Sequence, residues 1–388
     1  MRSLDSTTQR ALESGNPVVH GNRATFIWEG ESAPLLISDL SGWDATRRLR
    51  QFKRVSRNPS THLHSPAPAS GAGVRQVQVS LKAGLEPASD RTIWSCALTL
   101  PRDAYLEYAF YDPISQDKFL DPLNGHTVSN GVGSRNNYFY MPEAMPSPFS
   151  MRRAEVRGGK LTRHQVDTGF LQDDGERDVY LYKPPVTGPV PLVVVYDGYD
   201  YMHRAKLATI VDNLIAEKRI QPIALAFLQN GRSRRNVEYM CSDATLHWLD
   251  REILSLARQH LRLLNIEEYP GAYGVLGASA GGLMSMYTGF RMPEIFGKVI
   301  CQSGVFGLDG RDFAVVDLVR YSHARDLKIW MDVGTLDELL EDNRRLVALL
   351  DKRQYNVTYR EFAAGHNYTA WRDDIWRGLE AMFPFTSR

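Results

Sequence analysis

The sequence predicts a chain of two parts, an all-β sandwich followed by an α/β unit with a mostly parallel central sheet. In roughly the first third, short runs rich in β-branched and aromatic residues alternate with turn residues, a pattern typical of antiparallel sandwiches. From residue 158 onward, strand-like runs alternate with stretches of helical period, which indicates βαβ units. With 388 residues, 43% of them hydrophobic, the chain can build a core in each part.

The first part is expected to contain five short strands. Residues 62–74, rich in proline, serine, alanine and glycine, are expected to form a surface loop. A linker is predicted over residues 141–153, which contain three prolines, so the predicted domains are residues 1–145 and 146–388. The predicted strands are residues 24–29, 35–38, 77–81, 93–98 and 106–111.

The second part is expected to alternate strands with helices that keep apolar residues at helical spacing. An open parallel sheet places its functional groups at the carboxyl ends of its strands, so the residues that follow each strand are candidates for chemistry. The predicted strands are residues 179–182, 192–196, 223–227, 274–276, 299–302, 329–333 and 357–362. The predicted helices include residues 207–214, 249–264, 339–350 and 371–382.

Composition narrows the classes of partner. The chain has 46 basic and 45 acidic residues, a formal net charge of +1, which gives no general reason to expect a nucleic-acid or membrane partner. The amino terminus lacks the apolar core of a signal peptide, and no apolar run approaches the ~20 residues that cross a bilayer. Cys96, Cys241 and Cys301 are few, odd in number and far apart, which fits a reducing compartment. We therefore expect a cytoplasmic protein.

The stretch from Gly277 to Gly281 predicts a sharp strand-to-helix turn with Ser279 at its centre. Its G-x-S-x-G spacing is a steric requirement, because the residues two before and two after the serine must leave room for strand and helix to approach. Such a turn lifts the serine hydroxyl clear of the sheet, where a base can take its proton. Ser279 is the candidate nucleophile, and a tight βα turn without chemistry is the alternative.

A nucleophilic serine needs a histidine base, expected after a later strand. Only His323 and His366 follow Ser279 in the sequence, and His260 precedes it on a predicted helix. His366 comes just after the last predicted strand and before the last helix, whereas His323 falls in a polar stretch without such a placement. His366 is therefore the candidate base.

The acid that orients the base is expected between the last two strands. Asp337 is preferred because it follows the 329–333 strand and opens a helix, with Glu338 second and Asp332 third. The alternative for Asp337 is a carboxylate that caps the first turn of that helix. A site in which the acid is weakly placed could also work as a serine–histidine dyad.

Acyl transfer also needs donors for the developing oxyanion. The backbone N–H of Ala280, directly after the serine, is one of them by construction of the turn. The second is expected from the loop after the 192–196 strand, where Gly198 permits an unusual backbone angle. We favour the N–H of Tyr199, with that of Gly198 as the second choice.

The chain resembles the enterochelin (enterobactin) esterases, within the wider esterase D group of α/β-hydrolases, over nearly its whole length. In the amino-terminal half, residues 26–28, 39–43 and 121–124 are similar to the immunoglobulin-like domain of those esterases. In the carboxyl-terminal half, the resemblance rests on residues 195–198, 277–282, 333–337, 343–346, 365–368 and 371–372.

The resemblance implies an α/β-hydrolase domain preceded by an immunoglobulin-like domain, with Ser279 matching the nucleophile, His366 the base and Asp337 the acid. It further implies hydrolysis of an ester in an iron-loaded catecholate trilactone, a small-molecule siderophore, which would release the iron. No protein-bound metal or cofactor is expected, since no cluster in the sequence has ligand spacing. A feruloyl or acetyl-xylan esterase and a non-catalytic ligand-binding protein on the same fold are the alternatives.

A ferric triscatecholate carries strong negative charge, so a basic rim is expected beside the site. Arg232, Arg234 and Arg235 follow the 223–227 strand and could clamp such an anion. The alternative is a solvated loop in which Arg235 pairs with Glu238. Trp371 is also expected to contact the substrate.

Overall fold

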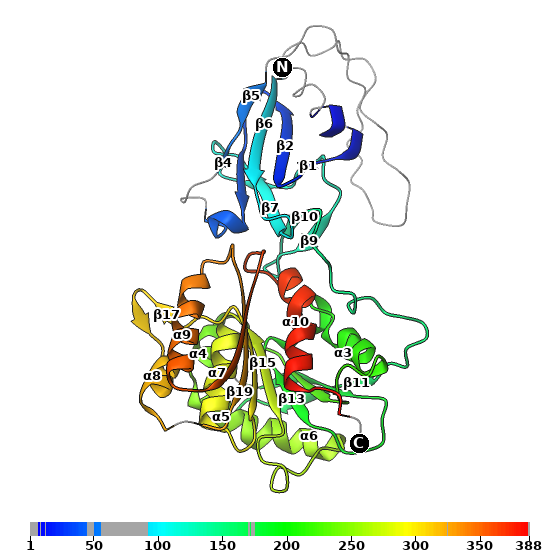
Figure 1. The fold of residues 1–388 in the computed structure, drawn as a ribbon, viewed down its shortest axis with the longest axis vertical. Helices are drawn as coiled ribbons and strands as arrows, with labels where there is room; N and C mark the ends of the chain where they lie inside the picture. Colours follow the sequence, from blue (N-terminus) through cyan, green and yellow to red (C-terminus); the bar gives the residue numbers. More distant parts are fainter. Residues whose placement is uncertain are drawn as a thin grey trace. The chain divides into compact units, whose positions relative to one another are not determined.

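The computed structural model describes residues 7–386, except 8, 12, 45–49, 56–91, 170, 172–174 and 324. The predicted strand at 77–81 and the predicted loop at 62–74 therefore lie outside the described residues. The chain divides into two compact units, Met1–Ala144 and Met145–Arg388 (Figure 1).

The first unit contains two antiparallel sheets, with strand orders β1-β2-β6-β5 and β4-β3-β7-β10-β9, and β8 pairs with β7. Phe26 of the first sheet packs edge-on against Tyr108 of the second, with ring centroids 4.8 Å apart, so aromatic rings form the core between the sheets. The strands are β1 Val18–His20, β2 Arg23–Gly30, β3 Leu35–Ser38, β4 Arg50–Gln51, β5 Lys53–Val55, β6 Thr92–Thr99, β7 Tyr105–Tyr111, β8 Lys118–Phe119, β9 Thr127–Ser129 and β10 Arg135–Tyr140.

The second unit is built on one eight-stranded sheet of order β11-β12-β14-β13-β15-β16-β19-β20. The pairs β11–β12 and β12–β14 are antiparallel, and all the other pairs are parallel. Every strand predicted for this unit is present, which confirms the mostly parallel sheet. The strands are β11 Lys160–Asp167, β12 Glu176–Lys183, β13 Leu192–Val195, β14 Ala224–Leu228, β15 Gly274–Ala278, β16 Lys298–Gln302, β19 Lys328–Gly334 and β20 Asn356–Phe362, and a separate hairpin joins β17 Gly307–Leu308 to β18 Arg311–Asp312.

Helices cover both faces of this sheet because successive side chains of each strand point to opposite faces. In β13, Val193 and Val195 belong to the core under α3 and α10, whereas Val194 belongs to the core under α5 to α9. Among the described residues, no helix combines the length and apolarity that crossing a bilayer requires. The helices are α2 Gly198–His203, α3 Leu207–Ala216, η2 Arg232–Arg234, α4 Arg235–Tyr239, α5 Asp243–Trp248, η3 Leu249–Ile253, α6 Leu254–His260, α7 Ala280–Arg291, α8 Ala314–Tyr321, α9 Leu340–Lys352 and α10 Tyr368–Met382 (Figure 1).

The loops that follow β13, β14, β15, β16, β19 and β20 all emerge at one edge of the sheet, because these six strands run parallel. This edge therefore gathers the predicted site residues from segments that are far apart in the sequence.

Candidate active site

Ser279 occupies a strained turn between β15 and α7. Its backbone angles are φ 58° and ψ −124°, a region that non-glycine residues rarely adopt. Hydrogen bonds hold the turn, because the Ser279 amide donates to the Gln302 carbonyl at 2.9 Å and its carbonyl accepts from the Val305 amide at 3.3 Å. The serine is thus fixed by the neighbouring strand β16 and by the segment that follows it.

Close approach of neighbouring atoms limits the space at both glycines around Ser279. A Cβ on Gly277 would lie 2.2 Å from the backbone oxygen of Gly281, so any side chain would push strand and helix apart. A Cβ on Gly281 would lie 3.1 Å from Oδ2 of Asp197. The spacing of the motif therefore has the steric cause expected from the sequence.

His366 and Asp337 meet at the same edge of the sheet. His366 lies between β20 and α10, and Asp337 lies between β19 and α9. Nδ1 of His366 lies 2.9 Å from Oδ2 of Asp337, and the acid side chain is fully buried whereas the histidine is 31% exposed. The Leu339 amide donates to the other oxygen of Asp337, Oδ1, at 2.9 Å.

The carboxylate of Asp337 is kept ionised by its neighbours. Burial alone would raise the pKa of Asp337, but the positive charge and hydrogen bond of His366 lower it. The Leu339 amide and the Ser303 hydroxyl also lower it, so the net pKa lies below the usual aspartate value. This arrangement fits an acid that orients a histidine.

The other two candidate acids lie in different surroundings. Glu338 is exposed. Asp332 is fully buried and accepts hydrogen bonds from Trp330 Nε1 at 2.7 Å and from Gln302 Nε2 at 3.1 Å. Burial, together with repulsion from Asp374, raises the pKa of Asp332 well above its usual value. The geometry therefore pairs Asp337 with the histidine.

The structure corrects the expectation for Trp371. Its side chain is only 3% exposed, so it offers almost no surface to a substrate. The indole ring packs edge-on against His366, with centroids 4.9 Å apart, and its Nε1 donates to the Ser303 hydroxyl at 3.0 Å. Trp371 thus packs against the histidine, and its hydrogen bond links α10 to the segment after β16 that also holds the Ser279 turn.

The candidate oxyanion donors begin the helices after β13 and β15. The amides of Gly198, Tyr199 and Ala280 lie in the first turns of α2 and α7, where no intrahelical acceptor exists for them. The unusual backbone angle falls on Asp197, at φ 52°, and not on Gly198 as the sequence suggested. Gly198 is needed for space instead, since a Cβ there would lie 2.6 Å from the Leu228 amide nitrogen.

The three arginines of the predicted anion clamp differ in their surroundings. Arg232 and Arg234 are exposed in η2, after β14. Arg235 is half-buried and donates to both carboxylate oxygens of Asp197, from Nε at 2.7 Å and from Nη2 at 2.6 Å. The alternative pairing of Arg235 with Glu238 is not the one observed. Arg235 is therefore already engaged with a carboxylate.

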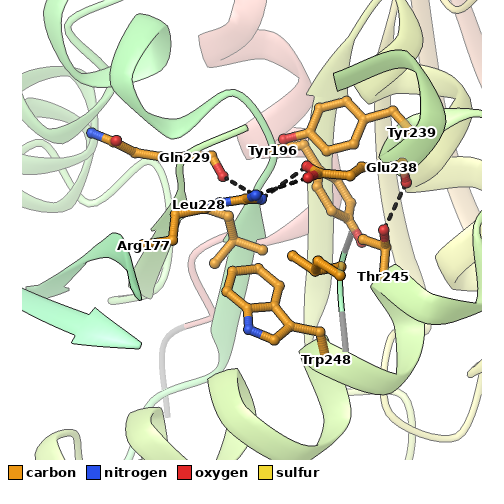
Figure 2. Close-up of a pocket in the computed structure, with 9 residues that line it drawn as sticks. Arg177, Tyr196, Leu228, Gln229, Glu238, Tyr239, Thr245 and Trp248 are labelled. Carbon is orange, nitrogen blue, oxygen red and sulfur yellow. Dashed lines mark hydrogen bonds and ion pairs between the residues drawn. The ribbon is translucent and has the colours of Figure 1, made fainter. Parts of the chain in front are cut away.

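Glu238 forms an ion pair with Arg177 of β12, and both residues line the cavity shown in Figure 2. The sequence did not predict this pair. Both hydrogen bonds measure 2.8 Å, and neither side chain is more than 6% exposed. Glu238 also accepts from the Gly231 amide at 2.9 Å, so this ion pair anchors the loop after β14. The cavity has no room for a water molecule, and we interpret it as a packed structural cluster. It is lined by Leu171, Arg177, Tyr196, Leu228, Gln229, Glu238, Tyr239, Thr245 and Trp248.

Among the described residues, no group of three or more histidine, cysteine, aspartate or glutamate side chains could hold a metal ion. The described cysteines, Cys96, Cys241 and Cys301, are all unpaired thiols.

The strand order and the serine turn define the α/β-hydrolase fold. The family described as "Putative esterase" matches residues 173–382, more than half of the chain, and the chain belongs to this esterase family.

Individual relatives agree with this assignment. The chain is 27% identical over 286 residues to the iron(III) enterobactin esterase of Dickeya dadantii, covering 67% of this chain and 63% of that protein. An Escherichia coli protein of the same name is 29% identical over 273 residues, covering 67% of this chain and 66% of that protein. The matches thus span less than two thirds of the length of these relatives.

Solved structures show the same fold over nearly the whole chain. The ferric enterobactin esterase of Salmonella typhimurium superposes with a TM-score of 0.71 at 18% identity, covering 93% of each chain. The enterobactin esterase of Shigella flexneri, solved in the presence of enterobactin, superposes with a TM-score of 0.69 at 16% identity, covering 93% of this chain and 92% of that one.

Proposed function

We propose that this protein is a serine carboxylic ester hydrolase that works through an acyl-enzyme on Ser279. The observation that carries the proposal is the 2.9 Å contact between His366 Nδ1 and the buried carboxylate of Asp337, at the same sheet edge as the strained serine turn. A series of contacts supports the proximity of the His366–Asp337 pair to Ser279. His366 packs on Trp371, and the Trp371 indole donates a hydrogen bond to Ser303. Two residues further on, the Val305 amide donates to the Ser279 carbonyl.

In the proposed reaction, the Ser279 hydroxyl oxygen attacks the ester carbonyl carbon while Nε2 of His366 takes its proton. The negative oxygen of the tetrahedral intermediate accepts hydrogen bonds from the amides of Ala280 and Tyr199, or of Gly198 in place of Tyr199. His366 then protonates the leaving alcohol oxygen as the ester C–O bond breaks. Water, deprotonated by His366, then attacks the carbonyl carbon of the acyl-serine. The bond between that carbon and Ser279 Oγ breaks, His366 returns the proton to Oγ, and the acid is released.

Asp337 holds His366 in the tautomer that this reaction needs. Its carboxylate accepts a hydrogen bond from the N–H group at Nδ1, so the lone pair lies on Nε2, the nitrogen that acts as the base toward Ser279. The same carboxylate stabilises the imidazolium that forms when His366 takes the serine proton.

We further propose that the substrate is a catecholate trilactone siderophore in its ferric form. The names of the relatives support this, and so do Arg232 and Arg234, exposed cations at the edge of the sheet that carries the serine. Cleavage shortens the chelator and so weakens its hold on iron, which is cargo of the substrate and not a cofactor. Unpaired thiols support action in the cytoplasm, after import.

We also propose that residues 146–388 form the catalytic domain and that residues 1–145 form the immunoglobulin-like domain of the enterobactin esterases. The two compact units and the two antiparallel sheets of the first unit support this division.

The test compares four substrates with the purified protein: ferric and iron-free catecholate trilactone, methyl ferulate and acetylated xylan. The highest kcat/KM is expected for a trilactone, and Ser279→Ala is expected to abolish hydrolysis of all of them. A higher kcat/KM for methyl ferulate or acetylated xylan would contradict the proposed substrate class. Trilactone hydrolysis that survives in Ser279→Ala would contradict the mechanism.

A further inference from the structure

We propose that Asp197 and Arg235 form an ion pair that positions the second oxyanion donor. The inference rests on the proposed esterase function, since a positioned oxyanion donor has a role only in acyl transfer. It concerns residues that do not touch the reacting atoms themselves, so both are positioning residues.

Asp197 is held by bonds to its side chain and to its backbone. Its carboxylate is only 1% exposed and accepts from Arg235 Nε at 2.7 Å and Nη2 at 2.6 Å. Asn230 Nδ2 donates to the same carboxylate at 2.5 Å, and the Asp197 amide donates to the Tyr239 hydroxyl at 3.1 Å. These bonds hold Asp197 at φ 52°, which an unrestrained aspartate rarely adopts.

The ion pair brings together three segments at the edge of the sheet where the candidate site residues gather. Asp197 follows β13, Arg235 and Asn230 follow β14, and the Asp197 carboxylate packs against Gly281 in the first turn of α7. Arg235 is fixed further by its guanidinium group, which lies over the Tyr239 ring at 5.3 Å from the centroid. The pair thus connects the turn of the nucleophile with the loop of the second donor.

The position of the pair determines what it can control. The amides of Gly198 and Tyr199 directly follow Asp197, so the backbone angles of Asp197 set their direction. Loss of the side-chain bonds would let Asp197 return to a common backbone conformation and would rotate both amides. An oxyanion donor acts mainly on the transition state, and we therefore expect kcat to fall while KM changes little.

This role differs measurably from a substrate clamp. If Arg235 served only to bind an anionic siderophore, its loss would raise KM for that anion and leave a neutral ester unaffected. A positioning role predicts a lower kcat for the anionic and for the neutral substrate. Measurements on a neutral ester such as p-nitrophenyl butyrate therefore distinguish the positioning role from the substrate clamp.

The test uses the full chain with Asp197→Asn, Arg235→Gln, Arg235→Lys and the double variant Asp197→Asn/Arg235→Gln. Removing one oxyanion donor altogether lowers kcat by about 10²–10³-fold, so we expect single variants to lose at least ~10-fold with KM within ~2-fold. Because both residues act through one contact, the double variant is expected to lose no more than the worse single variant. Arg235→Lys keeps the positive charge but cannot donate two parallel hydrogen bonds to the carboxylate, so its kcat is expected to fall less than that of Arg235→Gln.

The matched control is Arg344→Gln, which removes a similar two-pronged contact to Glu361, with bonds of 2.7 and 2.8 Å, in the same unit. Its kcat is expected to match that of the parent. Circular dichroism and thermal melting verify that each variant is folded. The rate at which a fluorophosphonate labels Ser279 gives a second readout, because its phosphoryl oxygen also needs the oxyanion donors; we expect it to fall in the Asp197 and Arg235 variants.

The outcomes distinguish this inference from the proposed function. The inference is overturned if folded Asp197 and Arg235 variants keep the parent's kcat on the neutral ester. It is also overturned if they change only the KM for the anionic siderophore. Either result leaves the esterase function in place. A parent protein without Ser279-dependent hydrolysis of any ester overturns both.

Discussion

Replacing Asp337 with asparagine tests whether the acid fixes the histidine tautomer. The Leu339 amide donates to Oδ1, and His366 Nδ1 faces Oδ2. The asparagine oxygen must stay with the Leu339 amide, because two facing N–H groups in a buried site cost about 1–3 kcal/mol. The asparagine NH₂ group then faces Nδ1, so the ring proton moves to Nε2, where the base is needed.

A base blocked in this way loses most of its catalytic effect. We expect kcat to fall by about 10³–10⁴-fold, equivalent to about 4–5.5 kcal/mol in the activation free energy, with KM little changed. The assay is steady-state hydrolysis of p-nitrophenyl butyrate at neutral pH, with the exposed Glu338→Gln as a control expected to keep the parent rate within ~2-fold. An Asp337→Asn enzyme that retained more than a tenth of the parent kcat would refute the triad and favour a serine–histidine dyad.

Three further predictions concern pH, packing and Trp371. The lowered pKa of Asp337 means that its ionised form stabilises the fold above the unfolded-state pKa of about 3.9. Denaturant titrations should therefore show the stability difference between parent and Asp337→Asn shrinking as the pH falls through the folded-state pKa; a constant difference would contradict this. Gly277→Ala should lower the free energy of unfolding by about 1–3 kcal/mol, because the new Cβ meets the Gly281 oxygen at 2.2 Å, whereas Gly125→Ala, with open space around it, should change it little. Trp371→Phe removes the indole hydrogen bond but keeps a ring, so kcat should fall without a rise in KM; a rise in KM alone would restore the substrate-contact interpretation.

The central strands could be predicted from the sequence because they are buried on both faces and read as continuous apolar runs. Strand β13, Leu192–Val195, is such a case, with all four residues buried. Strand β11, Lys160–Asp167, was not predicted because it is the outermost strand of the sheet. Only Val166 of this strand is buried, so its sequence shows no alternation of apolar and polar residues.

Candidate site residues could be predicted where the backbone geometry demands a residue type or a place in the strand order. Ser279 lies between Gly277, where a side chain would collide with the backbone, and Gly281, where space is tight. His366 and Asp337 follow the last two strands of the sheet. Side-chain partners could not be predicted, because they depend on which loops come together. Arg235 meets Asp197, which lies 38 residues earlier in the chain, and no local pattern records that contact.

Mass spectrometry of the covalent intermediate tests the central claim most directly. Brief incubation with p-nitrophenyl butyrate, followed by acid quenching and peptide mapping, is predicted to show a butyryl group on Ser279 in the parent protein. The adduct is detected when deacylation is slower than acylation, and it is expected to be absent from Ser279→Ala. An acyl group on another residue, or undiminished hydrolysis by Ser279→Ala, would contradict the acyl-enzyme mechanism.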